Sequence, residues 1–60
     1  MKYYATIKTD YQTVKIYVED KSFFVCGHDY MNEHYGDPEK YIKMVLHRAE
    51  QLNRKVVIER

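Results

Sequence analysis

The chain has little of the residue types that identify several common classes of protein. Its 60 residues include only two glycines and one proline. Disordered and low-complexity chains are usually richer in such residues, whereas 45% hydrophobic and 32% charged residues is an ordinary globular composition. Sixty residues is near the lower limit at which a hydrophobic core supports a fold without disulfides or metal. We therefore expect one small domain over residues 1–60.

Cysteine and long apolar runs are also scarce. The single cysteine, Cys26, has no partner for an intramolecular disulfide. No apolar run approaches the length of a membrane span, and the chain does not begin with a segment of signal-peptide type. We therefore expect a cytoplasmic protein with no membrane partner.

A clear excess of charge of one sign is missing as well. The formal net charge is +1, which gives no general case for nucleic acid or an anionic membrane as the partner. The charges are nevertheless unevenly distributed, because the segment from Gly27 to Glu39 has four acidic residues and no Lys or Arg. These are Asp29, Glu33, Asp37 and Glu39. This acidic segment favours a partner with a basic surface.

Alternating apolar and polar residues predict two strands near the start of the chain, joined as an antiparallel hairpin. They span Lys2–Thr9 and Thr13–Val18. Phe23 to Cys26 is a third strand that is apolar on both faces. The segment from His28 to Gly36 has no usable period, so we expect it to be the longest irregular stretch.

One helix is expected after this segment. Asp37-Pro38 predicts its start, because Asp caps free amide groups and Pro at the first helical position lacks an N–H that would be unpaired. The helix should run to about Asn53 and pack through one apolar arc. The arc contains Tyr41, Ile42, Val45, Leu46, Ala49 and Leu52. A last short strand is expected from Lys55 to Glu59.

These elements predict an α+β fold in the order β-β-β-α-β: an antiparallel meander, one helix packed on one sheet face, and a short C-terminal strand. The other sheet face should then be open. From the alternation we expect it to carry Tyr4, Thr6, Lys8, Lys15 and Tyr17, with Val57 beside them.

The sequence argues against most enzymes and against a cofactor. Two glycines are too few for a glycine-rich phosphate loop. A hydrolytic site would use His28 or His34 as a base that Asp29 or Glu33 orients. No motif positions a nucleophile beside them. We expect no catalytic residue.

Metal binding is a further alternative. Thiolate and imidazole are common zinc ligands, and three such side chains lie close together in the sequence. They are Cys26, His28 and His34. Their spacing matches no standard zinc site, so the expectation is that no metal is bound.

Binding to another protein is the function that the sequence favours most. Tyr and Met side chains are enriched where proteins contact each other, and several lie near the acidic segment. The residues predicted to bind a partner are Tyr4, Tyr17, Tyr30, Met31, Glu33 and Tyr35. An open sheet face or strand edge also suits a homodimer. The alternative is a small nucleic-acid binder that stacks bases on an aromatic and basic sheet face, with Tyr4, Lys8, Lys15 and Tyr17 as its contacts.

Two resemblances point the same way. The stretch YYATIKTDYQTVKIYVE, followed by a capped helix and a strand, resembles a short bacteriophage-encoded inhibitor of host RNA polymerase. Three strands followed by GDPEKYIKMVLHRAEQL look like the N-terminal domain of HicB-type antitoxins, although the usual Pro-Gly-Cys turn and a C-terminal DNA-binding segment are missing. Both resemblances imply a module that docks onto another protein, such as a phage- or mobile-element-encoded inhibitor of a host macromolecular machine.

Overall fold

Five strands and one helix form in the chain, as a computed structural model of all 60 residues shows. The elements are β1 (Lys2–Thr9), β2 (Thr13–Val18), β3 (Ser22–Cys26), β4 (Met31–Tyr35), α1 (Pro38–Gln51) and β5 (Val56–Glu59). The strands form one sheet in the order β4-β3-β2-β1-β5. The predicted α+β class, with a meander, one helix and a short last strand, is confirmed.

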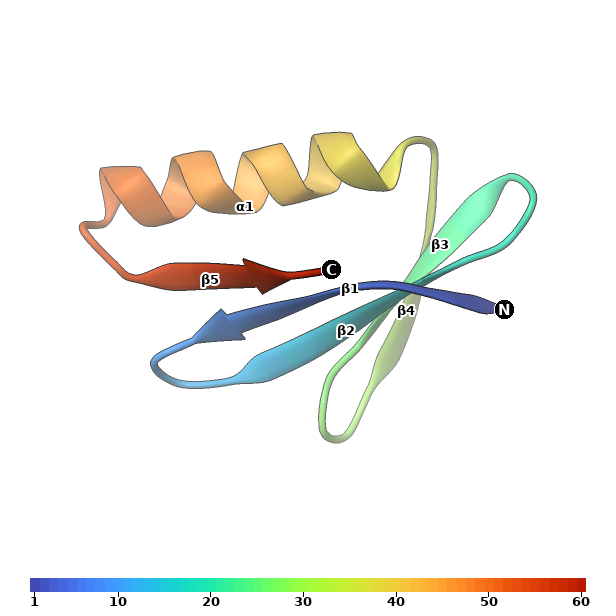
Figure 1. Ribbon diagram of the computed structural model, residues 1–60, viewed down its shortest axis with the longest axis horizontal. Helices are drawn as coiled ribbons and strands as arrows, with labels where there is room; N and C mark the ends of the chain where they lie inside the picture. Colours follow the sequence, from blue (N-terminus) through green and yellow to red (C-terminus); the bar gives the residue numbers. More distant parts are fainter.

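Every pair of neighbouring strands in this sheet is antiparallel. The chain makes consecutive hairpins from β1 to β4, then crosses the sheet through α1 and adds β5 beside β1. The strands before and after the helix therefore occupy opposite edges and run in the same direction. Figure 1 shows the helix on one side of a strongly twisted sheet whose strands fan out beneath it.

The core lies between α1 and the helix-facing side of the sheet. Its sheet residues alternate along β1, β2 and β3, as half-buried strands require. They are Ala5, Ile7, Val14, Ile16, Phe23 and Val25. The helix contributes Ile42, which is 1% exposed, while Tyr41 and Val45 pack at the margin. Leu46 and Leu52, expected on the packed arc, are largely exposed instead.

The helix begins and ends where local chemistry requires. An Asp37 Oδ oxygen accepts a hydrogen bond of 2.9 Å from the Glu39 amide, and Pro38 follows the cap. At the other end Asn53 has a φ of 55°, and the Arg54 amide donates to the Ala49 carbonyl at 2.8 Å. The left-handed conformation of Asn53 turns the chain so that backbone amides can pair with carbonyls that the helix leaves unpaired. The helix is too short and too polar to cross a membrane.

The segment predicted to be irregular contains a strand. β4 pairs with β3 from Ser22 opposite Tyr35 to Cys26 opposite Met31. Its alternation is hard to recognise because it lies at the sheet edge, where only His34 is partly buried. An edge strand needs no apolar face along its whole length, and a charged residue such as Glu33 suits an edge.

A β-bulge in β1 reverses the predicted placement of two tyrosines. The pairing of β1 with β2 shifts between Tyr3 and Ala5, so one extra residue, Tyr4, is accommodated there. Tyr4 consequently lies on the helix side, where it packs against the core, and Tyr3 lies on the open face. The expectation that Tyr4 belongs to the open face is wrong, because strict alternation does not hold across a bulge.

Candidate functional site

A row of aromatic side chains crosses the open face of the sheet. Tyr3 is opposite Tyr17, and Tyr17 is opposite Phe24. Residues directly opposite each other in neighbouring strands share a face, so the row spans β1, β2 and β3. The rings of Tyr3 and Tyr17 meet edge to face, with their centroids 5.9 Å apart. Glu33 of β4, opposite Phe24, ends the row with a carboxylate.

Two further large side chains extend this surface along β4. Met31 and Tyr35 alternate with Asn32 and His34, so they share the open face with Glu33. They are 57% and 78% exposed, so they enlarge the contiguous uncovered surface that the aromatic row begins. We call Tyr3, Tyr17, Phe24, Met31, Glu33 and Tyr35 the open-face cluster.

The structure brings together four of the six residues predicted to bind a partner. Tyr17, Met31, Glu33 and Tyr35 belong to the open-face cluster. Tyr4 is on the helix side, as described above. Tyr30 lies in the turn between β3 and β4, where its ring packs directly over the backbone of Gly27.

Two members of the cluster, Tyr3 and Phe24, are absent from the sequence-based site. The position of Tyr3 depends on the bulge, which no sequence pattern marks. Phe24 was recognisable in principle, because a strand that is apolar on both faces must present one apolar residue to the uncovered side. Phe23 and Phe24 are adjacent, and only Phe23 is fully buried.

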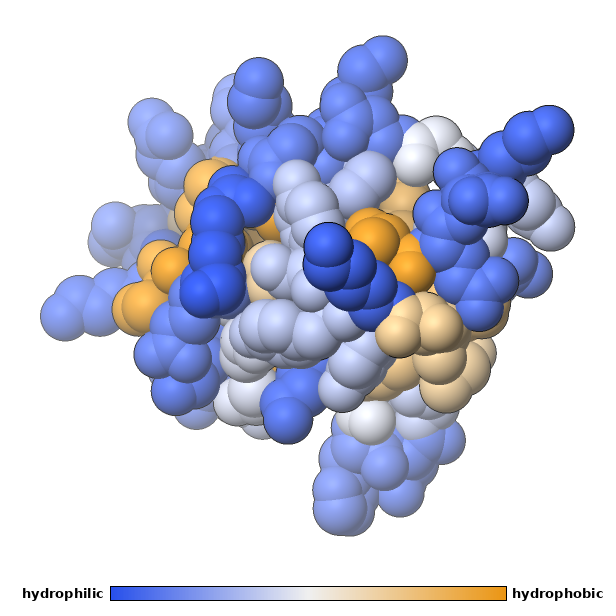
Figure 2. Space-filling view, turned by 45° about the vertical axis from the view of Figure 1, so that its right-hand side comes forward, coloured by the Kyte–Doolittle hydropathy of each residue, from blue (hydrophilic) through white to orange (hydrophobic).

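The charged residues elsewhere on the open face have both signs, and some of them form ion pairs. The Lys8 ammonium lies 3.1 Å from a carboxylate oxygen of Glu59 on the neighbouring strand. Lys15 sits opposite Cys26 and Thr6 and has no carboxylate within ion-pair distance. Hydrophobic atoms reach the surface in patches bordered by hydrophilic residues, as Figure 2 shows for one side of the molecule. The open face is therefore aromatic and only weakly charged.

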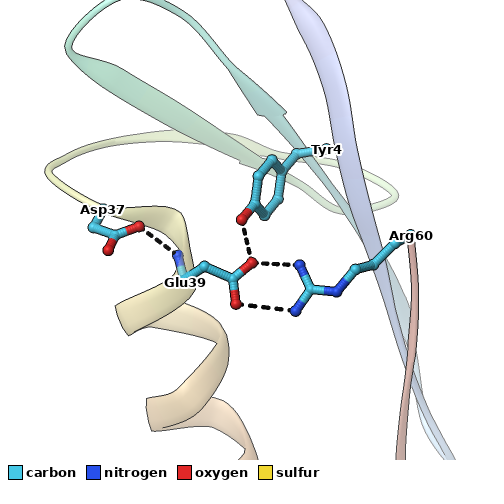
Figure 3. A network of polar contacts seen from close by, with 4 residues as sticks. All are labelled: Tyr4, Asp37, Glu39 and Arg60. Carbon is cyan, nitrogen blue, oxygen red and sulfur yellow. Dashed lines mark hydrogen bonds and ion pairs between the residues drawn. The ribbon is translucent and has the colours of Figure 1, made fainter.

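The acidic segment does not form one acidic surface. Asp37 is the helix cap, and Glu39 is held on the helix side by Tyr4 and Arg60 (Figure 3). Asp29 lies in the β3–β4 turn, 3.8 Å from the His28 ring. Only Glu33 lies on the open face. The expected complementarity to a basic partner thus depends on one carboxylate at this surface.

Glu39 is the centre of a polar network that joins the helix to the two ends of the chain. The Tyr4 hydroxyl and both terminal nitrogens of Arg60 donate to its carboxylate, one of them at 3.0 Å. The Arg60 and Tyr4 hydrogen bonds lower the pKa of Glu39 to about 2. The bond to Glu39 raises the pKa of Tyr4 above its ordinary value. The network therefore joins the first turn of the helix to β1 and to the end of the chain.

The alternative metal site is not formed. His34 lies on the helix side, stacked on Phe23 at a centroid distance of 5.2 Å. Cys26 pairs with Lys15 and lies on the open side with His28. No three side chains of His, Cys, Asp or Glu lie close enough to share a metal ion. The alternative that grouped Cys26, His28 and His34 around one metal ion is wrong, because strand β4 carries His34 to the opposite face of the sheet.

Comparisons with known proteins give no further direction. No protein-family model matches the sequence, and no match is found among curated proteins or solved structures. The resemblances to a phage inhibitor and to HicB-type antitoxins therefore stay predictions, and the function is argued from the surface alone.

Proposed function

We propose that this protein is a non-enzymatic protein-binding module that docks another protein on its open sheet face. The observation that carries the proposal is the open-face cluster, in which five large apolar or aromatic side chains share a sheet face with one carboxylate and no helix covers them. Tyr, Phe and Met are the residues enriched at the centres of protein interfaces. Burial of this surface by a partner would remove it from water.

Three features favour protein over nucleic acid as the partner. Tyr4, one of the residues expected to stack bases, is on the other side of the sheet. The charge of Lys8 is paired with Glu59, and Glu33 places a carboxylate at the end of the aromatic row. Single-strand binders combine stacking rings with a basic groove that follows the phosphates. Here Lys15 is the one cation beside the row without a paired carboxylate.

Within this proposal, the sequence resemblances favour a phage- or mobile-element-encoded inhibitor that modulates a host macromolecular machine. A small rigid domain with one exposed sheet face suits that role, because it loses little conformational entropy on binding. A homodimer through the same face is the competing arrangement. It would leave the face buried and unavailable to a second protein.

The proposal is tested with two matched double variants. Met31→Ala with Tyr35→Ala removes the two most exposed apolar or aromatic members of the cluster, and Met44→Ala with His47→Ala removes two exposed side chains from the helix. Met31 and Met44 are 57% and 58% exposed, so the methionines of the two variants differ in location and not in accessibility. Tagged chains are used to capture partners from a bacterial lysate with and without nuclease, and the captured protein is purified for affinity measurement.

The expected result is a stoichiometric, nuclease-resistant partner whose affinity falls at least about tenfold in the sheet variant and not in the helix variant. Equal affinity of both variants would overturn the assignment of the site. Sedimentation of the isolated chain distinguishes the homodimer, which would dissociate in the sheet variant. Nuclease-sensitive capture that weakens steeply with salt would replace the protein partner with nucleic acid.

A further inference from the structure

On the opposite side from the open-face cluster, the C-terminal half of α1 and the sheet line a partly open cavity of about 220 Å³. Ile7 and Val14 of the sheet and Ala49 of the helix form its buried floor. The rings of Tyr11, Tyr30 and Tyr41 stand at its walls. The cavity is thus mainly apolar and aromatic.

The charged groups of this cavity are all of one sign. Arg48 from the helix and Arg54 after it are the only charged side chains in its lining, and no carboxylate is among the lining residues. Arg54 already has two partners. Its guanidinium lies 5.2 Å from the centroid of the Tyr11 ring and 3.8 Å from an Asp10 carboxylate oxygen. Arg48 has no ion pair and no side-chain hydrogen bond. An apolar chamber with a free guanidinium at its rim is complementary to an apolar anion.

The volume limits the size of such a ligand. An apolar cavity of about 150 Å³ is known to hold benzene, so 220 Å³ has room for one aromatic ring with a short chain. Tyrosine walls favour an aromatic body, because offset or edge-to-face ring contacts add to apolar burial. The guanidinium of Arg48 provides two parallel N–H donors, which match the geometry of a carboxylate.

We propose that this cavity binds a small arylalkyl carboxylate, with its ring against the tyrosines and its carboxylate on Arg48. The binding is independent of the open-face cluster. A ligand seated here contacts both α1 and the sheet, so it stabilises the packing of one on the other by mass action.

The test is a titration of the isotope-labelled chain, followed by its amide NMR signals, with three probes of equal length. The probes are phenylpropionate, phenylpropanol and phenylpropylamine, which share a phenyl ring on three carbons and differ in the polar atoms and charge of the head group. We expect saturable shifts of the Val45, Ala49 and Val56 amides, with a dissociation constant of about a millimolar or below for phenylpropionate. Phenylpropionate should bind about fivefold tighter than the alcohol, and the amine should bind most weakly.

The variant Arg48→Gln should bring the carboxylate within about twofold of the alcohol. Lys43→Gln, which removes a cation from the solvent side of the same helix, should leave the preference unchanged. Equal affinities of acid and alcohol for the unmodified chain, or no saturable shift below about 20 mM, would overturn the proposal. The proposal would also be overturned if an acetylated glutamate-phenylalanine-glutamate tripeptide shifted these amide signals and phenylpropionate did not. The cavity would then be a peptide site.

Discussion

The Tyr4 hydroxyl donates a hydrogen bond to the Glu39 carboxylate, joining the bulge of the first strand to the first turn of the helix across 35 residues of sequence. Arg60 completes the network from the end of the last strand. Three elements that are remote in sequence are therefore connected at one carboxylate, as Figure 3 shows. This contact exists only because the bulge directs Tyr4 to the helix side.

The network predicts a specific dependence of stability on pH. The pKa of Glu39 is about 2 in the folded chain, against an ordinary value of 4.5. A depressed carboxyl pKa contributes stability that is fully present above the unfolded value and is lost as the pH falls toward 2. Glu39→Gln should thus be less stable than the unmodified chain at pH 6, and the difference should shrink between pH 4.5 and pH 2.5. Urea unfolding at several pH values measures it.

Glu50→Gln is the control for this prediction, because Glu50 is exposed on the same helix and has no ion pair. Its effect on the free energy of unfolding should be small at every pH. A difference between Glu39→Gln and the unmodified chain that stays constant from pH 6 to pH 2.5 would contradict the assigned role of the carboxylate.

The helix is predicted to depend on Ile42 far more than on Leu46. Ile42 is 1% exposed in the core, whereas Leu46 is 40% exposed. Ile42→Val should cost about 0.5 to 1.5 kcal/mol and Ile42→Ala about 2 to 5 kcal/mol, because truncation leaves a cavity that the sheet cannot fill. Leu46→Ala should change the free energy of unfolding by less than about 1 kcal/mol. Comparable losses of unfolding free energy at both positions would mean that the helix is rotated about its own axis and packs both side chains against the sheet.

Gly27 and Tyr30 should be energetically coupled. A Cβ on Gly27 would lie only 2.2 Å from the Tyr30 ring, so Gly27→Ala must displace that ring. Overpacking of this kind typically costs about 1 to 3 kcal/mol. With Tyr30→Ala already present, the same substitution should cost only a few tenths of a kcal/mol. A double-mutant cycle from thermal unfolding measures the coupling, and strict additivity would show that the ring does not rest on Gly27.

The helix cap at Asp37 is the remaining test of stability. Its side chain accepts a hydrogen bond from the Glu39 amide. Asp37→Ala should lower the free energy of unfolding by about 1 kcal/mol, whereas Asp37→Asn keeps an accepting oxygen and should lose less. Circular dichroism during denaturation compares the two. An equal loss in both variants would indicate that the negative charge, and not the cap, is what stabilises the helix start.

Local patterns in the sequence predict most of the fold. The alternation of Ile7, Val14 and Ile16, and the Asp37-Pro38 start signal, reflect forces that act within a few residues. The sequence does not predict strand β4, because an edge strand at the margin of a sheet covered by one helix needs little apolar burial. The position of β5 beside β1 follows from tertiary packing, which no local pattern records.

The candidate site was predicted in part for the same reason. The chemistry of Met31, Glu33 and Tyr35 predicts a binding role although their segment has no strand pattern, and the alternation of β4 brings them to one face. Tyr3 and Tyr4 exchanged sides because one inserted residue in β1 inverts the alternation. The helix-side cavity was not anticipated, since its walls come from segments that are distant in the sequence.

The position of β1 between β2 and β5 also sets an order of assembly. Its pairing with β2 closes a turn of a few residues, whereas its pairing with β5 joins positions such as Lys8 and Glu59 that are 51 residues apart. Contacts between distant residues cost more loop-closure entropy and tend to form late in folding. The hairpins from β1 to β4 can therefore form a nucleus before β5 docks. Weakening β5, for example with Ile58→Val, would then speed unfolding while leaving the folding rate almost unchanged.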